Sequence, residues 1–395
     1  MEEIVSYSSI DADDARPPIP VLPVLSWRTF FGSRRAPRFR CVLEAGEAVS
    51  VTSGTAAIAL ALEHAGMRDG DKVLLPAFHC TSMIEPFVAA GVRPVYYRIH
   101  ADTSVDLADI AAKLDGSVKA VLATHYFGFY QDMRALRALC DKYRVVLIED
   151  CAHAFFGEVQ GHPIGSYGDY AIVSARKFFA IQDGGYLVSA RHSLNGLAMK
   201  SAHWAFELKS ALDVVELAVA SARLKPLPIV LRPLVACKSR VWRKIKQQRH
   251  VSTIGPSVTD GYQYLDLGWV HARMSLVSRA LMRLSTKEAI AQKRRENYGR
   301  MAGGLSQLST AKPLFRHLPE DVVPYMFPLV LEHPDRIFPI LKSKGVPIWR
   351  WEELADSDCE ISRRYSKSLL QLPCHQELRD NEMDWMIAAI KQTVR

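Results

Sequence analysis

Lys177 lies in the stretch "VSARKFFAIQDGGYL", residues 173–187, which we call the lysine loop. The run before Lys177 has the character of a buried strand, and two phenylalanines follow it. A lysine in buried surroundings is costly unless it is paired, neutral or covalently used. The pair Gly184-Gly185, preceded by Asp183, then turns the chain into a second apolar run. The stretch is typical of an active-site loop.

Two further groups of polar residues could take part in chemistry. Ser53-Gly54-Thr55 stands at the start of an apolar, helix-like run. Free backbone N–H groups, the helix dipole and two hydroxyls would suit a phosphate there, although an ordinary Ser/Thr N-cap gives the same pattern. Glu149-Asp150 closes the apolar run "VVLIED". Acids at the end of such a run are either structural or functional.

These three groups fit one cofactor when they are taken together. A phosphate seat, a buried aspartate and a buried lysine are what pyridoxal phosphate requires. The lysine amine would form a Schiff base with the cofactor aldehyde, so it need not be buried as a bare ammonium. The aspartate would keep the pyridine nitrogen protonated, which makes the ring an electron sink. The glycine pair would let the backbone pass close to the cofactor.

From about residue 50 to 192 the sequence alternates β-like runs with helical stretches. These are the elements that must position the three groups. Near-continuous apolar runs between amphipathic helices predict an α/β fold, with a mostly parallel sheet covered on both faces. Ligands gather at the carboxyl ends of the strands in such sheets. Ser53, Asp150 and Lys177 all fall at predicted strand ends.

After residue 192 this alternation stops. A helical stretch is expected at 200–222 and a long one at about 269–307, and from 320 a strand and two helices predict a smaller α+β domain. We expect five parts: an N-terminal arm (1–44), a large cofactor-binding domain (45–200), a helical and basic insert (201–262), a linking helical region (263–312) and a small C-terminal domain (313–395).

The composition narrows the class of protein. The seven cysteines are scattered and contain no CxxC pair, which argues against a disulfide framework and against a zinc site. We expect no metal. The acidic N-terminus lacks the apolar core of a secretory signal, and no run of about eighteen uncharged apolar residues occurs. A cytoplasmic protein in a reducing compartment is expected.

The net charge of +8 is unevenly distributed. Residues 223–249, which we call the basic segment, hold nine Lys/Arg and no Asp or Glu, so the total of +8 leaves −1 for the rest of the chain. Apolar residues alternate with the basic ones, and three prolines interrupt any long helix. The segment could contact an anionic membrane at the inner face, or it could be a solvated insert folded over a dimer. No motif supports nucleic-acid binding.

Many short stretches resemble the DegT/DnrJ/EryC1/StrS family of sugar aminotransferases, which have the fold of aspartate aminotransferase, a pyridoxal-phosphate-dependent fold of type I. The resemblance covers roughly 45–190 and 265–395. The matching stretches are "SGTAAIALAL", "GDKVLLPAF", "AAGVRPVYY", "THYFGF", "IEDCAHAFFG", "GSYGDYAIVSARKFFAIQDGG", "ARMS", "KRRENY" and "LLQLPCHQEL".

Carried over to this sequence, the resemblance makes Lys177 the Schiff-base lysine and proton shuttle. Asp150 would pair with the pyridinium nitrogen. His153 holds the position where the family has Gln or His beside the cofactor ring. His125 matches a histidine at a strand end of the family, or it is a packing residue near the site.

The resemblance also implies the residues of the phosphate seat. Gly54, Thr55 and Ala56 would bind the phosphate through the start of the helix. Ser174 would add a hydroxyl from the lysine loop.

The chain departs from the family pattern at several positions. Cys80 stands where the family usually has an aromatic residue to stack on the pyridine, and Phe78 or His79 could substitute. His271 replaces an asparagine that reaches the phosphate of the neighbouring subunit. The family's "LRnHG" after the glycine pair is missing, and the span that contains the basic segment is longer than in the family.

The resemblance implies an aminotransferase that moves an amino group from an amino acid, usually glutamate, to a nucleotide-linked keto-sugar in polysaccharide or glycoconjugate biosynthesis. It also implies a homodimer. One alternative is the sugar dehydratase branch of the family, which has histidine in place of the lysine. The other is a non-catalytic relative that serves as a scaffold or regulator.

Overall fold

The computed structural model describes residues 17–31, 37–224 and 264–394. Its large sheet has the strand order β1-β9-β8-β5-β4-β2-β3. Strand β9 runs antiparallel to both neighbours, and the other neighbouring pairs are parallel. The predicted α/β fold with a mostly parallel sheet is therefore confirmed. The strands are β1 Glu47–Val51, β2 Lys72–Pro76, β3 Arg93–Tyr97, β4 Val118–Thr124, β5 Val146–Asp150, β8 Tyr170–Ser174 and β9 Gly185–Ser189.

Helices cover both faces of this sheet, as the apolar runs predict. In β4, Val121 and Ala123 join the core on one face, together with residues of α3 and α4. Ala120 and Leu122 join the core on the opposite face, with residues of α1 and α2. The helices are α1 Gly54–His64, α2 Thr81–Ala89, α3 Leu107–Lys113 and α4 Met133–Tyr143.

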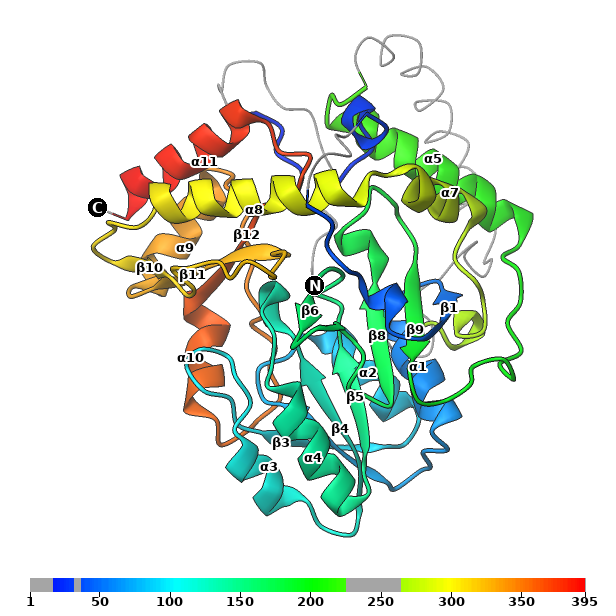
Figure 1. The fold of residues 1–395 in the computed structure, drawn as a ribbon. Coiled ribbons are helices and arrows are strands. Elements are labelled where there is room, and N and C mark those ends of the chain that lie inside the picture. Colours follow the sequence, from blue (N-terminus) through cyan, green and yellow to red (C-terminus); the bar gives the residue numbers. More distant parts are fainter. Residues whose placement is uncertain (1–16, 32–36, 225–263, 395) are drawn as a thin grey trace, which may run out of the picture.

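Three helices follow the sheet in the chain, namely α5 Trp204–Ala220, α7 Leu276–Leu284 and α8 Lys287–Gly304. The single helical stretch expected at about 269–307 is two helices, because Ser285 has extended backbone with φ −73° and ψ 134°. Helix α8 crosses the molecule from the end of α7 to the small domain (Figure 1). Short elements occur along the chain before the small domain. They are the 3₁₀ turns Trp27–Thr29, Val42–Glu44, Tyr126–Gly128, Ala175–Lys177 and Leu267–Trp269, and the hairpin of β6 Glu158–Val159 and β7 His162–Pro163.

The small domain has an antiparallel sheet of order β10-β11-β12, and its α+β character is confirmed. Strand β12 and helix α10 were not assigned from the sequence. The predicted boundary between 312 and 313 falls inside β10, whose strand begins at Ala311. The elements are β10 Ala311–Pro313, β11 Met326–Leu331, β12 Leu369–Pro373, α9 Pro334–Ser343, α10 Glu360–Ser368 and α11 Asp380–Thr393.

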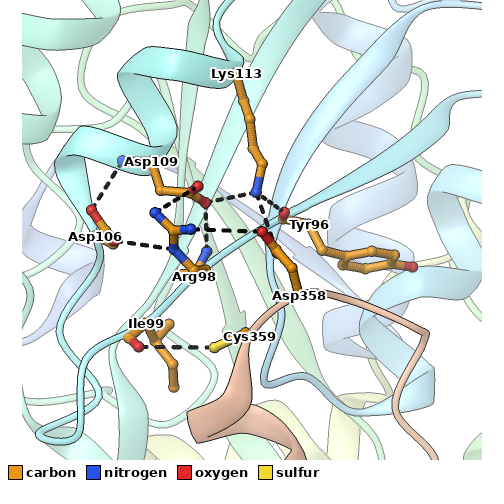
Figure 2. A network of polar contacts seen from close by, with 8 residues as sticks. All are labelled: Tyr96, Arg98, Ile99, Asp106, Asp109, Lys113, Asp358 and Cys359. Carbon is orange, nitrogen blue, oxygen red and sulfur yellow. Dashed lines mark hydrogen bonds and ion pairs between the residues drawn. The ribbon is translucent and has the colours of Figure 1, made fainter.

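A polar network attaches the start of α10 to the large domain (Figure 2). The buried carboxylate of Asp109 in α3 accepts from the backbone N–H of Arg98 at 2.8 Å and pairs with Lys113 at 2.7 Å. The exposed Asp358 lies 3.6 Å from the Arg98 guanidinium and 3.7 Å from the Lys113 amine. The thiol of Cys359 adds a long contact to the carbonyl of Ile99 at 3.9 Å. The two domains are therefore joined here at β3 and α3.

The insert expected at 201–262 is described up to Leu224, and the rest of the basic segment lies outside the described residues. The first basic residue, Arg223, is buried and pairs with Glu382 of α11 at 2.7 Å. Its charge is therefore neutralised inside the protein. None of the helices in the described ranges has the length and apolar character that a membrane span requires.

Candidate active site

The carboxyl edge of the large sheet brings the predicted residues together. Thr124 and Asp150 are register partners at the ends of β4 and β5. Ser174, at the end of β8, pairs in register with Gly185 of β9, and Gly185 pairs in turn with Val51 of β1. The start of α1, the lysine loop and the end of β5 therefore follow one another along this edge.

The predicted phosphate seat is the first turn of α1. The Ser53 hydroxyl accepts from the backbone N–H of Ala56 at 3.1 Å, so the N-cap interpretation holds for this residue. The N–H groups of Gly54 and Thr55 have no acceptor within the helix, as in the first turn of any helix. A Cβ added to Gly54 would lie 3.3 Å from the Cβ of Ser174, so the loop serine borders the same turn. Gly54, Thr55 and Ser174 can therefore present N–H and hydroxyl donors to one anion.

The glycine pair closes the lysine loop against the start of α1. Gly184 has φ +130°, a conformation that favours glycine, and its N–H donates to the carbonyl of Thr52 at 2.7 Å. A Cβ on Gly185 would lie 2.6 Å from the backbone of Ser53 and from the carbonyl of Val173. The pair therefore serves a close approach between backbone segments, which in turn places Ser174 beside the predicted phosphate seat.

Asp150 ends β5 and is buried. One carboxylate oxygen accepts from the N–H of Ala152 at 2.9 Å, and the other accepts from the Thr124 hydroxyl at 3.3 Å. Burial raises the pKa of Asp150, and the positive charge of Lys177 opposes this rise. A buried carboxylate with one long hydrogen bond can accept another charged donor, such as a protonated pyridine nitrogen.

Lys177 ends the 3₁₀ turn that follows β8, and its amine lies 5.3 Å from the centre of the Tyr325 ring. Burial lowers the pKa of the Lys177 amine, and negative charge at Cys80 and Asp150 would raise it. A lowered pKa leaves more of the amine unprotonated, which is the form that reacts with an aldehyde. The amine and the carboxylate of Asp150 are close enough for each charge to affect the pKa of the other.

His153 is buried among aromatic rings. Its ring centre lies 4.5 Å from that of Tyr325 and 5.6 Å from that of Trp351. Its Nδ1 accepts from the backbone N–H of Phe127 at 3.4 Å. Burial, followed by the charge of Lys177, holds the pKa of His153 well below its ordinary value. The histidine is neutral, and it can contribute packing or a hydrogen bond but no positive charge.

The sequence left open which ring replaces the usual aromatic residue at Cys80. Phe78 packs against Trp351, with ring centres 4.9 Å apart, and is fully buried. His79 stacks on Tyr96 at 5.1 Å with an interplanar angle of 23°. The Lys177 amine lies over the ring of Tyr325. Tyr325 and Trp351 come from the small domain, and sequence reasoning missed them because no local pattern separates them from core aromatics.

His125 and Glu149 form a buried pair at 3.2 Å. The His125 Nδ1 accepts from the backbone N–H of Gln131 at 3.2 Å, so Nε2 carries the proton and donates to Glu149. Glu149 also accepts from the N–H groups of Gly165, Tyr167 and Gly168. This geometry favours the packing interpretation of His125 and a structural role for Glu149. Cys151 lies close to the pair, but the histidine and the carboxylate are already hydrogen-bonded.

Asp183 anchors the far end of the lysine loop. Its buried carboxylate accepts from the hydroxyls of Ser210 at 2.5 Å, Ser275 at 2.7 Å and Ser278 at 2.7 Å. The N–H of Ser275 adds a fourth bond at 2.7 Å. Asp183 therefore fastens α5 and the start of α7 to the loop, a role that the sequence did not reveal.

His271 lies away from the phosphate seat of its own chain. Its Nε2 is 3.0 Å from the carboxylate of Glu63, near the C-terminal end of α1. Gly54 and Thr55 stand at the opposite end of that helix. His271 is therefore not placed to bind a phosphate at the α1 start of its own chain.

The family model of DegT/DnrJ/EryC1/StrS aminotransferases matches residues 36–201, a range that holds Lys177, Asp150 and the α1 start. The chain carries a DegT/DnrJ/EryC1/StrS aminotransferase family domain. This domain contains the whole large sheet, from β1 to β9. The resemblance stated from the sequence is thus confirmed for the part at about 45–190.

Curated relatives match over less than half of the chain. A GDP-perosamine synthase of Vibrio cholerae is 35% identical over 150 residues, which cover 37% of this chain and 41% of the relative. A UDP-N-acetyl-3-dehydro-alpha-D-glucosamine 3-aminotransferase of Acidithiobacillus ferrooxidans is 33% identical over 149 residues, or 36% of this chain and 40% of the relative. The chain thus matches about two fifths of the length of these relatives.

The fold extends the likeness to the rest of the molecule. NtdA of Bacillus subtilis, solved with bound cofactor PMP, superposes with a TM-score of 0.59 at 18% identity. The match covers 89% of this chain and 74% of that chain. The predicted aminotransferase fold, with a large and a small domain, is confirmed.

Proposed function

We propose that the protein is a pyridoxal-phosphate-dependent aminotransferase that transfers an amino group from an amino acid to a nucleotide-linked keto-sugar. One observation carries the proposal: Lys177, Asp150 and the start of α1 meet at one edge of the family domain. The relatives named above act on GDP-linked and UDP-linked sugars, which supports this class of acceptor. Glutamate is the proposed donor, as the resemblance implies.

The residues at this edge fit the cofactor. The N–H groups of Gly54 and Thr55, with Ser174, would hold the phosphate, and the Ala56 N–H would join if Ser53 released it. Asp150 would hold the proton on the ring nitrogen. When bound, the group supplies an electron sink for bond changes at the carbon that carries the amine.

The chain's own residues would carry the proton transfers. The pKa of Lys177 is lowered by burial, so its amine can take a proton from the donor carbon in the first half of the reaction. The same amine can return a proton during delivery to the ketone. His153, neutral and buried, would border the ring without adding positive charge. Lys177 also separates this proposal from the dehydratase alternative, in which the resemblance implies histidine.

Borohydride trapping tests the assignment directly. The protein is incubated with pyridoxal phosphate, reduced and digested, and the labelled peptide is identified by mass spectrometry. We expect the label on the peptide that contains Lys177, and we expect Lys177→Ala to bind the cofactor without becoming labelled. A label on another lysine would overturn the site. Absence of any binding would favour the scaffold alternative.

We also propose a cytoplasmic homodimer in which His271 faces the cofactor phosphate of the partner. The pairing of His271 with Glu63, away from the α1 start of its own chain, supports this placement. Sedimentation equilibrium should give twice the chain mass, and His271→Ala should retain the cofactor less well through repeated gel filtration. An active monomer would contradict the proposal.

A further inference from the structure

Arg294 of α8 is a fully buried cation that is paired with no carboxylate in the described part of the chain. Its Nε donates to the side-chain oxygen of Gln376 at 3.0 Å. Its guanidinium stacks on the ring of Phe178, 4.5 Å from the ring centre. Burial lowers the pKa of Arg294 to about 10, so the side chain is still charged at neutral pH. A charge buried without a counter-charge is costly, which calls for a role that needs a guanidinium.

The two terminal nitrogens of Arg294 hold the main chain on both sides of the candidate site. Nη2 donates to the carbonyl of Lys177 at 2.7 Å. Nη1 donates to the carbonyls of Pro324 and Tyr325, both at 3.1 Å. One planar group therefore links the turn that carries the lysine amine with the segment that enters β11.

We call the contacts of Arg294 with these three carbonyls the clamp. Gln376 extends the clamp by one residue. Its amide nitrogen donates to the carbonyl of Phe178 at 2.9 Å, while its oxygen accepts from Arg294. Lys177 is the last residue of the short 3₁₀ turn and Phe178 follows it. Because no helix continues from this turn, no helical N–H groups bind the carbonyls of these two residues. They are held by side chains that come from α8 and from the turn after β12.

This clamp holds the backbone of the two residues whose side chains meet at the lysine amine. The same guanidinium binds the backbone of Lys177 and the backbone of Tyr325, whose ring lies 5.3 Å from the Lys177 amine. We propose that Arg294 is a positioning residue that sets the place of the Lys177 amine relative to Tyr325 and Asp150. The inference rests on the proposed function for its meaning in catalysis, but its geometric claim can be tested without the cofactor.

The first test measures the Lys177 amine in cofactor-free protein. The rate of its modification by an amine-reactive reagent is followed against pH by mass spectrometry of the Lys177 peptide. In Arg294→Met the turn should loosen, and the midpoint should rise by about one pH unit towards the value of a solvated lysine. Arg294→Lys keeps the charge but cannot span the three carbonyls, so its midpoint should also rise. A purely electrostatic role would leave Arg294→Lys unchanged and would refute the inference.

Matched variants separate positioning from general loss of stability. Arg300→Met removes an exposed arginine of the same helix, which pairs with Asp380 and Asp384, and it should leave the midpoint unchanged. Gln376→Met keeps the charge of Arg294 but removes the hold on Phe178, so it should shift the midpoint in the same direction by a smaller amount. If the Arg294 variants fail to fold, Gln376→Met decides. An unshifted midpoint in that folded variant would then overturn the inference.

The second test uses the loaded enzyme. Because misplacement of a reacting group reduces the chemical step more than binding, Arg294→Met should lower kcat by about 10-fold or more with KM nearly unchanged. Values of kcat within about twofold of wild type would contradict a positioning role. If wild type never takes pyridoxal phosphate on Lys177, the proposed function fails, while the cofactor-free titration still decides the role of Arg294.

Discussion

At the scale of single residues, substitution of the buried Asp150 is the most direct test of the proposed function. Asp150→Asn keeps the shape and the hydrogen bond from Ala152 but removes the negative charge that would hold a pyridinium proton. We expect pyridoxal phosphate to remain bound and kcat to fall by about 10²-fold or more, as for the loss of a preorganised electrostatic partner. Steady-state rates and cofactor content per chain check this. Near-normal turnover would make Asp150 structural.

The buried His79 should make the free energy of unfolding depend on pH. Its Nε2 accepts from the backbone N–H of Ala355 at 3.2 Å, and burial lowers its pKa from 6.5 to about 4. Between these values the unfolded chain binds more protons than the folded one, so the free energy of unfolding falls as the pH drops from 6.5 towards 4. His79→Gln should weaken this acid sensitivity by up to about 3 kcal/mol, at about 1.4 kcal/mol per unit of pKa.

Chemical unfolding of wild type and variant at pH 7 and pH 5 measures the effect of His79. The exposed His317 provides a control, because His317→Gln should leave the pH dependence as it is in wild type. Parallel curves for wild type and His79→Gln would contradict the prediction.

From the sequence we could predict those candidate site residues that belong to local motifs. Lys177, Asp150 and the α1 start are recognisable because each follows an apolar strand, and a parallel sheet brings strand ends to one edge. Tyr325 and Arg294 could not be found in this way, because they reach the lysine loop from elements more than one hundred residues later in the chain. Their position depends on how α8 and the small domain pack on the large domain, which no local pattern encodes.

At the scale of elements, the network around α3 holds the start of α10 in place (Figure 2). Asp109→Ala would leave the backbone N–H of Arg98 without its buried acceptor and would remove the partner of Lys113. We expect a loss of about 2 kcal/mol in the free energy of unfolding. Asp358→Ala removes an exposed carboxylate and should change stability by less than about 0.5 kcal/mol. Denaturant titration of both variants tests the contrast, and equal losses would contradict it.

Some helices and strands were not predicted correctly from the hydrophobic periodicity of the sequence. The helical pattern of 269–307 continues through Ser285, yet the backbone there is extended and α8 begins afresh after it. Strand β12 was missed because its five residues are all buried and show no alternation. The domain division predicted from the sequence, including its arm and insert, remains a prediction.

At the scale of the whole molecule, the basic segment raises the question of membrane contact. Arg223 cannot take part, because it is buried against Glu382. The remaining basic residues lie outside the described part of the chain. If they bind an anionic surface, the protein should sediment with anionic liposomes at low ionic strength, bind neutral liposomes poorly and be released as salt rises.

Charge reversal decides whether the segment is responsible. The test variant reverses Lys238, Arg240, Arg243, Lys244 and Lys246, and it should no longer bind the liposomes. A control that reverses the exposed Lys119, Lys142 and Lys342 should still bind. Retained binding by the test variant, or no binding by wild type, would favour the insert folded over the dimer. An increased KM for the sugar nucleotide would place the segment at the active site.

The antiparallel strand β9 has a consequence for the order in which the protein forms. Strand β1 reaches the sheet only through β9, and β9 is the last strand of the sheet to leave the ribosome. Pairing between segments so distant in sequence is slow to form. A nascent chain that ends before β9 holds β1 without a strand to pair with. If the first turn of α1 binds the phosphate as proposed, its seat is complete only after Ser174 and the lysine loop have been synthesised. We therefore expect the cofactor to bind after the first half of the sheet has assembled, and not to guide that assembly.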